Sequence, residues 1–343
     1  MGKMPMPRLR AEVEAMAKPK VALYWAASCG GCEIAVVDIE EHILDVAAAF
    51  DIVFWPCIMD FKVKDVEAIE DGGILVTLFN GAIRNSEQEH MAKLLRRKSK
   101  VLVAFGSCAH EGCIPGLANA TTKEAIFKTV YHETASTDNP NGVEPKTKTE
   151  MPEGVLELPE FYKSVHSLDQ VVDVDYYVPG CPPQSNQIWG VLEYLIQGKP
   201  LPDKGAILGA GQKTCCDECP RTRKEKKIKT FHRPHEIIPN PDECLLDQGI
   251  LCMGPATRDG CGAKCVKVGV PCRGCYGVPP GSKDMGMKMI SALSSVIDSE
   301  DPDEIDRIVG QIADPIGTFY RFSLAHSILF RVQDDLKPKA QAK

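Results

Sequence analysis

Two cysteines three positions apart lie in the stretch YWAASCGGCEIAVVD, residues 24–38, between an apolar strand-like run and an apolar helix-like pattern. A pair of thiols such as Cys29 and Cys32 is typical of a zinc site, a redox disulfide or an iron–sulfur cluster. Because one C-x-x-C pair is common to all three, the remaining cysteines have to distinguish these chemistries.

The chain contains 15 cysteines, an odd number that fits poorly with a closed disulfide framework. Nine of them lie between Cys215 and Cys275. No apolar run reaches the length of about 18 residues that a membrane span needs, and the N-terminus carries no secretory signal. We therefore expect a cytoplasmic protein without a membrane span, whose thiols stay reduced and bind metal. Two further C-x-x-C pairs support metal binding: Cys216/Cys219 and Cys272/Cys275.

Length and charge limit the remaining possibilities. The chain has 343 residues, of which 44% are hydrophobic, enough for one large domain or two ordinary ones. The formal net charge of −7 argues against a general nucleic-acid-binding protein.

Five short runs rich in Val, Ile, Phe and Tyr predict strands, and the amphipathic segments between several of them predict helices. This alternation predicts an α/β fold, in which helices cover both faces of a doubly wound parallel sheet, over residues 1–205. The predicted strands are residues 20–26, 51–56, 73–82, 100–107 and 170–178, and the predicted helices are residues 33–48, 86–97 and 184–197.

The loops that follow the strands of such a sheet gather along one edge, where sites form. Cys29 and Cys32 follow the first predicted strand, Cys108 follows the fourth, and Cys181 follows the fifth. We therefore expect these four thiols to converge into one four-cysteine site. The two glycines of CGGC would let the backbone pass close to a ligand.

After a linker at residues 198–214, the sequence loses its hydrophobic periodicity and becomes rich in Cys, Pro and Gly. We expect little regular structure between residues 215 and 282, and a core that is inorganic, because such a segment cannot bury enough apolar surface to fold alone. Helical periodicity, broken at Pro302 and Pro315, predicts a helical tail. Residues 206–343 would form this second domain.

The motifs CGGC, GSCAHEGC and PGCPP, followed by the later cysteine series, resemble the small subunit of nickel–iron hydrogenases. More narrowly, the sequence looks like the cytoplasmic methyl-viologen-reducing type, whose partner is often heterodisulfide reductase. The resemblance covers about residues 20–280 and implies a flavodoxin-like first domain. It also implies an electron-transfer subunit without catalytic residues, because the nickel–iron centre of the family lies in a separate large subunit.

The resemblance further implies three 4Fe–4S clusters, each held by four cysteines. The implied ligands are Cys29, Cys32, Cys108 and Cys181 for the proximal cluster, Cys261, Cys265, Cys272 and Cys275 for the medial cluster, and Cys216, Cys219, Cys244 and Cys252 for the distal cluster.

Two of these positions depart from the family pattern. Cys216 stands where the distal cluster usually has a histidine, and the adjacent Cys215 remains an alternative ligand. Cys265 stands in the place of a proline of the medial cluster, which usually holds three irons. Both departures imply all-cysteine four-iron clusters, which favour low reduction potentials.

The other polar and sulfur-bearing residues carry weaker signals. Cys57 and Cys113 lack partners at cluster spacing, and we interpret them as packing residues. Glu33 lies in the first turn of a predicted helix, where a carboxylate is favoured by the helix dipole. The basic segment 221–235 is either a solvated loop or a docking patch for an acidic electron-accepting subunit.

Two other classes of protein use similar cysteine pairs. A zinc-binding scaffold fits poorly, because structural zinc ligands are usually local in sequence. The related iron–sulfur subunit of respiratory complex I carries adjacent cysteines in the first loop and lacks the second cysteine-rich domain. The electron acceptor stays open: heterodisulfide reductase, reached through an iron–sulfur protein, and an electron-bifurcating flavin-based NADH/ferredoxin module are both compatible with this sequence.

Overall fold

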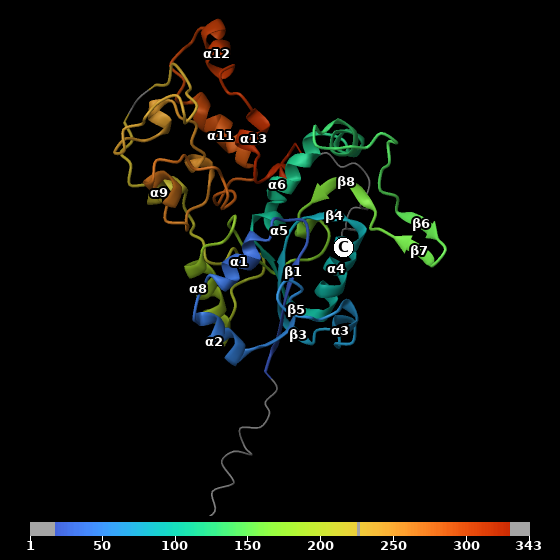
Figure 1. The fold of residues 1–343 in the computed structure, drawn as a ribbon. Helices are drawn as coiled ribbons and strands as arrows, with labels where there is room; N and C mark the ends of the chain where they lie inside the picture. Colours follow the sequence, from blue (N-terminus) through green and yellow to red (C-terminus); the bar gives the residue numbers. More distant parts are fainter. Residues whose placement is uncertain (1–17, 225–226, 330–343) are drawn as a thin grey trace, which may run out of the picture.

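The computed structural model describes residues 18–224 and 227–329. A five-stranded, all-parallel sheet with the strand order β2-β1-β3-β5-β9 lies at the centre of the first region (Figure 1). Numbered within this sheet alone, the order is 2-1-3-4-5, the flavodoxin-like arrangement, so the predicted fold class is confirmed. The strands are β1 (Lys20–Trp25), β2 (Asp51–Phe54), β3 (Ile74–Asn80), β5 (Ser99–Phe105) and β9 (Tyr176–Val178).

Each face of the sheet is covered by its own set of helices (Figure 1). Side chains alternate along a strand, so Ala22 and Tyr24 of β1 join one apolar cluster while Val21 and Leu23 join the other. The first cluster contains residues of α3 (Val63–Glu67) and α4 (Ser86–Lys98), and the second contains residues of α1 (Gly31–Val37), α2 (His42–Ala49) and α8 (Ser185–Ile196).

Two of the sequence-based elements differ from the structure. The predicted helix 33–48 is two helices, α1 and α2, because Glu40 between them has a φ of 59°, which a right-handed helix cannot contain. The predicted strand 170–178 is too long: only β9 is a strand, and Leu168–Gln170 forms a 3-10 turn instead. Asp175, just before β9, accepts a hydrogen bond from the Leu102 backbone N–H, which fixes where pairing with β5 begins.

Smaller elements surround the sheet. The strands β4 (Ile83–Asn85) and β8 (Phe161–His166) pair antiparallel, and the exposed hairpin of β6 (Lys148–Met151) and β7 (Gly154–Glu157) projects from the body (Figure 1). The short helices α5 (Ser107–Glu111) and α6 (Cys113–Gly116) follow β5, and α7 (Lys123–Lys128) follows them.

Regular structure is sparse between residues 215 and 282, as predicted: the only α-helices described there are α9 (Cys215–Glu218) and α10 (Lys264–Lys267). The C-terminal helices are α11 (Met285–Ser294), α12 (Pro302–Val309) and α13 (Pro315–Phe319). Pro302 and Pro315 each occupy the first position of a helix, where proline is favoured, so they begin helices rather than break one.

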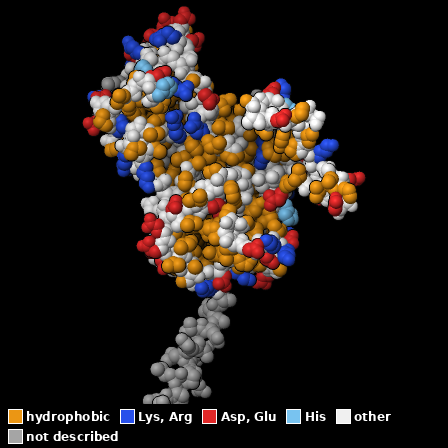
Figure 2. Space-filling view, viewed as in Figure 1, with side chains coloured by type: hydrophobic (Ala, Val, Ile, Leu, Met, Phe, Trp, Pro, Cys, Tyr) orange, Lys and Arg blue, Asp and Glu red, His pale blue; other side chains and the backbone are white. Residues whose placement is uncertain are grey.

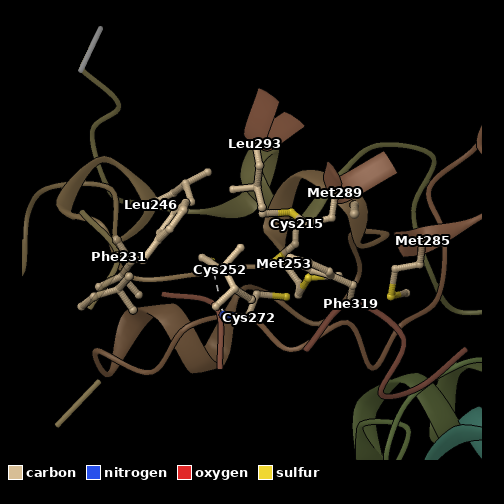
Figure 3. Packing of buried hydrophobic residues seen from close by; sticks show 14 of the residues in the cluster. Cys215, Phe231, Leu246, Cys252, Met253, Cys272, Met285, Met289, Leu293 and Phe319 are labelled. Carbon is tan, nitrogen blue, oxygen red and sulfur yellow. Dashed lines mark hydrogen bonds between the residues drawn. The ribbon is translucent and has the colours of Figure 1, made fainter. Parts of the chain in front are cut away.

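The cysteine-rich segment and the C-terminal helices share one apolar cluster (Figure 3). Leu246 and Met253 of the segment pack with Met289, Leu293 and Phe319 of the helices. The expectation of an inorganic core is therefore incomplete, because the tail supplies the apolar surface that the cysteine-rich segment lacks.

The last described residues return to the first region. The backbone N–H of Cys113 donates to the carbonyl of Phe322 at 3.1 Å. Gly112 has a φ of +82°, and a Cβ built there would lie 2.4 Å from the Cβ of Ala325. The close packing of the tail against the α5–α6 turn therefore depends on a glycine at position 112.

The linker is also tied to the sheet. The backbone of Tyr177 in β9 accepts from Leu208 at 2.7 Å and donates to Ala206 at 3.1 Å. The division into domains at residues 205/206 stays a prediction.

In residues 18–224 and 227–329, no helix combines the length and the hydropathy that crossing a lipid bilayer requires.

We expect Gly112→Ala to lower the free energy of unfolding by about 2–3 kcal/mol, through a left-handed backbone penalty of about 1–2 kcal/mol plus overpacking against Ala325. The matched control is Gly198→Ala, where φ is +63° but a Cβ meets nothing within 4 Å. Denaturant unfolding measures both variants. Equal losses would contradict the proposed close packing, because the control carries only the backbone penalty.

Candidate functional site

The first group of cysteines lies at the carboxyl edge of the parallel sheet. Cys29 and Cys32 occupy the turn from β1 into α1, Cys108 lies on α5 directly after β5, and Cys181 follows β9. Burial raises the pKa of the Cys32 thiol, and the charges of Cys108, Cys181 and Cys29 raise it further. The structure thus brings together the four thiols that the strand order predicts, from three separate loops.

Glycines make this convergence possible. Gly106 has a φ of +81°, and a Cβ there would lie 2.4 Å from the Sγ of Cys32. The loops after β5 and β9 are joined by backbone hydrogen bonds, from Gly106 N–H to the carbonyl of Val178 and from Ser107 N–H to that of Gly180, both 2.8 Å. The loop that carries Cys108 therefore has one fixed position beside Cys32.

A fifth thiol, which the sequence-based reasoning missed, joins this group. Cys113 is fully buried, and its Sγ donates to the Sγ of Cys181 at 3.8 Å. A second hydrogen bond joins Cys113 to Cys108, and both bonds raise the pKa of Cys113. Cys113 therefore has sulfur partners as well as packing neighbours. Its position five residues after Cys108, across the α5–α6 turn, was the available signal.

The second group combines Cys261, Cys265, Cys272 and Cys275 in the cysteine-rich region. Burial raises the pKa of Cys275, and the charges of Cys272 and Cys261 raise it further, with smaller effects from Cys181 and Cys265. Burial and then Cys272 and Cys261 also raise the pKa of Cys265. The four predicted partners are therefore electrostatic neighbours, and Cys275 also faces Cys181 of the first group.

Cys215 belongs to this second group. It is buried, and its single S–H can donate to Cys261 or to Cys272, which lowers the pKa of those two residues and raises its own. Cys215 and Cys113 therefore have the same relation to their groups. Each is a fifth buried thiol that can hydrogen-bond to two cysteines of its group.

The third group surrounds a space of about 410 Å³, part of which is open to solvent. Burial and then the charges of Cys244 and Cys219 raise the pKa of Cys216 to about 12. The guanidinium of Arg223 acts in the opposite direction, since it also lines this space. The predicted distal cysteines all line the space, and the alternative Cys215 lines it as well: Cys215, Cys216, Cys219, Cys244 and Cys252.

The three groups follow one another through the molecule. The hydroxyl of Ser107, next to Cys108, donates to the carbonyl of Cys275. The backbone N–H of Cys272 donates to the Sγ of Cys252 at 3.3 Å, so the second and third groups are also neighbours (Figure 3). From the sheet edge into the cysteine-rich region, the cysteine groups therefore lie in the order first, second, third.

The donor sets suit a cationic inorganic centre. Burial raises the pKa of Cys32, and it raises the pKa of Cys216 and Cys252 to about 12, so these thiols ionise only where nearby positive charge offsets burial. Iron supplies that charge in a thiolate-bound cluster. In the described part of the chain, no three His, Cys, Asp or Glu side chains are arranged to hold a single metal ion.

Of two minor interpretations from the sequence, the one for Cys57 was wrong and the one for Glu33 was incomplete. Cys57 is exposed, so it is not a buried packing residue. Glu33 lies in the first turn of α1, but its carboxylate is buried and accepts hydrogen bonds from the Trp55 indole and the Asn80 amide. Burial raises the pKa of Glu33, against the lowering effect of these two donors.

The basic segment has several structural roles. Arg221 is buried and donates to the backbone carbonyls of Val266, Asn240 and Glu243. Other side chains of the segment pair with surface acids, and Lys226 lies outside the described residues. The surface pairs are Lys224–Glu243, Lys227–Asp298 and Lys229–Asp298. Such exposed pairs are weak, so the lysines stay available to a partner.

Comparisons with known proteins cover both regions. Residues 29–195 match the family model described as NADH ubiquinone oxidoreductase, 20 Kd subunit. The chain is 42% identical to the iron–sulfur subunit of the F420-non-reducing hydrogenase of Archaeoglobus profundus, over 90% of this chain and 97% of that protein. It is 34% identical to a subunit of the F420-non-reducing hydrogenase of Methanothermobacter marburgensis, over 91% and 96% of the two chains.

Among solved structures, the chain is similar to one in the crystal structure of an NAD⁺-reducing nickel–iron hydrogenase in the H₂-reduced state. The sequence identity is 29% and the TM-score is 0.46, over 54% of this chain and 96% of that one.

Cys215 and Cys216 both line the space of the third group, but only Cys215 also hydrogen-bonds to Cys261 and Cys272 of the second group. We expect Cys216→Ala to abolish the electron paramagnetic resonance signal of one reduced cluster, because a ligand of the third group is lost. Cys215→Ala should keep every signal and about the same iron content, but lower the midpoint potential of one cluster, because hydrogen bonds to cluster sulfurs tune that potential. Loss of a cluster in Cys215→Ala, with all clusters kept in Cys216→Ala, would reverse the assignment.

Proposed function

Because the chain belongs to the family of the iron–sulfur subunits of F420-non-reducing hydrogenases, which are nickel–iron hydrogenase small subunits, we propose a specific electron route for it. Electrons from hydrogen oxidation at the large subunit pass through three 4Fe–4S clusters to an iron–sulfur or flavin partner. The observation that carries the proposal is the series of three neighbouring four-cysteine groups between the sheet edge and the outer cysteine-rich region.

The proposed ligands are those of the three groups. The proximal cluster would be held by Cys29, Cys32, Cys108 and Cys181, the medial cluster by Cys261, Cys265, Cys272 and Cys275, and the distal cluster by Cys216, Cys219, Cys244 and Cys252. Each cluster supplies a one-electron carrier when bound. The chain contributes burial, thiolate charge and hydrogen bonds, and these set the reduction potentials.

Hydrogen-bond donors are unevenly distributed over the three groups. Cys113 supplies a thiol to two sulfurs of the proximal group, and Cys215 supplies one to two sulfurs of the medial group. The distal group has the charge of Arg223 and a backbone donor, the N–H of Cys272, which bonds the Sγ of Cys252. Because donors and positive charges stabilise the reduced state, these residues offset part of the lowering that all-cysteine ligation causes.

The proximal group suits a contact with the large subunit. Cys29 and Cys181 are exposed in this single chain. Large apolar side chains are exposed on the same loops and helices, with Trp25 at 44%, Ile34 at 63% and Ile114 at 49%. A protein partner that covers these side chains would exclude water from the proximal cluster.

The distal group suits the exit of electrons, because its cavity is partly open and the basic segment begins beside it. We propose that the acceptor is an acidic iron–sulfur or flavin protein, either the entry protein of heterodisulfide reductase or an electron-bifurcating NADH/ferredoxin module. A cytoplasmic location belongs to the same proposal, because it keeps thiols reduced for cluster assembly.

The two alternative classes have less support. The family model of the 20 Kd subunit of NADH ubiquinone oxidoreductase matches only the first region, whereas the hydrogenase relatives match both. A zinc scaffold would leave the purified chain colourless. Broad visible absorption, with brown colour that bleaches on reduction, is the outcome expected for iron–sulfur clusters.

We expect about twelve irons per chain and no three-iron cluster. Cys265→Pro should lower the iron content by about one and create a three-iron signal in the oxidised protein, because the fourth medial iron loses its thiolate. Cys265 lies in the first turn of α10, where its backbone N–H has no intrahelical partner that a proline would remove. A three-iron signal in the unaltered protein, with about eleven irons, would contradict the all-cysteine assignment.

We expect Lys227→Glu with Lys229→Glu to slow electron transfer to the protein acceptor, but not to a small dye, because only the protein needs electrostatic steering. In the unaltered chain, the rate of electron transfer to the protein acceptor should fall as the salt concentration rises above about 0.1 M. At that ionic strength, charges more than about 10 Å apart are screened from one another. The control is Lys93→Glu with Lys100→Glu, on α4 and at the start of β5. Equal effects of the two double variants, or loss of dye reduction, would contradict a docking role.

A further inference from the structure

A second basic feature lies on the cysteine-rich region, where Lys and Arg side chains gather near α11 and α13 (Figure 2). Three guanidinium groups from separate segments line one cavity of about 650 Å³ that is partly open to solvent. Arg233 comes from the basic segment, Arg273 lies between Cys272 and Cys275, and Arg321 follows α13. We call this cavity the three-arginine pocket.

The arginines lack acidic partners within the described part of the chain. None of the three forms an ion pair there; Arg321 Nε donates only to the carbonyl of Gly317. Asp314 also lines the pocket, but its Oδ1 accepts the backbone N–H of Gly317 at 2.9 Å and caps α13. Three guanidinium cations therefore face one carboxylate that is already engaged, which leaves an excess of positive charge in the pocket.

The guanidinium groups repel one another. Arg233, Arg273 and Arg321 line the same cavity, so their like charges lie close together. Arginine stays charged in proteins, so the repulsion is not relieved by loss of a proton. An anion in the pocket would relieve it.

The chemistry of the pocket selects an oxyanion. The planar fork of arginine matches the two oxygens of a carboxylate, and Thr318 adds a hydroxyl to the lining. Asp314 disfavours a doubly charged phosphate more than a singly charged carboxylate. The place of the pocket also matters: its lining residues Leu251 and Arg273 are the sequence neighbours of Cys252 and Cys272, which puts the pocket beside the distal and medial groups.

We propose that the three-arginine pocket receives a carboxylate side chain of the electron-accepting protein. This inference rests on the proposed function, since it names the chemistry by which the acceptor docks. The basic segment steers the acceptor from a distance, whereas the pocket holds one acidic side chain beside the outer clusters. Charge complementarity between the guanidinium groups and a carboxylate favours this occupant.

The test uses the intact complex of this chain with its large subunit, and a fluorescent hexaglutamate peptide as the probe. Fluorescence anisotropy should show binding that weakens about tenfold in Arg233→Gln and in Arg321→Gln, since each loses a charge-assisted hydrogen bond. The control Arg307→Gln removes one charge from a surface pair with Glu304 on α12 and should stay within about twofold.

Arg233 is exposed, so Arg233→Gln keeps the test valid even if Arg321→Gln fails to fold. Equal peptide binding by Arg233→Gln and Arg307→Gln would overturn the proposal. Displacement of the peptide by inorganic phosphate at concentrations where acetate has no effect would also overturn it, in favour of a phosphorylated ligand. Failure of the electron-transfer function would appear differently, as missing iron or missing dye reduction in the unaltered complex.

Discussion

The close approach of the β5 loop to the turn after β1 is the constraint on which the cysteine groups depend. Gly106 brings its backbone so near the Sγ of Cys32 that no side chain fits between them. The hydrogen bonds from Gly106 and Ser107 to the β9 loop then hold Cys108 and Cys181 on the same side. Parallel strands supply the rest, because their carboxyl ends meet at one edge and collect thiols that lie far apart in sequence.

The second and third cysteine groups are positioned by contacts that begin at that edge of the sheet. The Ser107 hydroxyl bonds the Cys275 carbonyl, and the Cys272 backbone bonds the Cys252 sulfur, so each group is fixed against the next. The C-terminal helices fill the apolar space behind the second and third groups, and the residues after α13 pack against the α5–α6 turn. The tail therefore stabilises the whole series, which the cysteine-rich segment could not do with its own few apolar residues.

Additional thiols act on the two inner groups, and arginines act on the outer one. Cys113 and Cys215 are buried, and the S–H of each can donate to either of two cysteines of an inner group, whereas Arg221 and Arg223 line the partly open third group. Buried donors and exposed charge both stabilise a reduced cluster, but only exposed charge also acts on a partner. In the proposed function, the outer end of the series therefore both tunes its cluster and recognises the acceptor, and the three-arginine pocket would extend this recognition beside it.

The sequence by itself determined the parallel sheet, the edge where Cys29, Cys32, Cys108 and Cys181 meet, and the irregular character of residues 215–282. Those features follow from residue type, short-range periodicity and the rule that strand-end loops share an edge. Only the tertiary structure decided the break at Glu40, the partners of Cys113 and Cys215, and the meeting of Arg233, Arg273 and Arg321. Each depends on a backbone angle or on contacts between distant segments, and no local pattern encodes them. Cys215 and Cys216 are adjacent in sequence and both line the space of the third group, yet only Cys215 also hydrogen-bonds to cysteines of the second group.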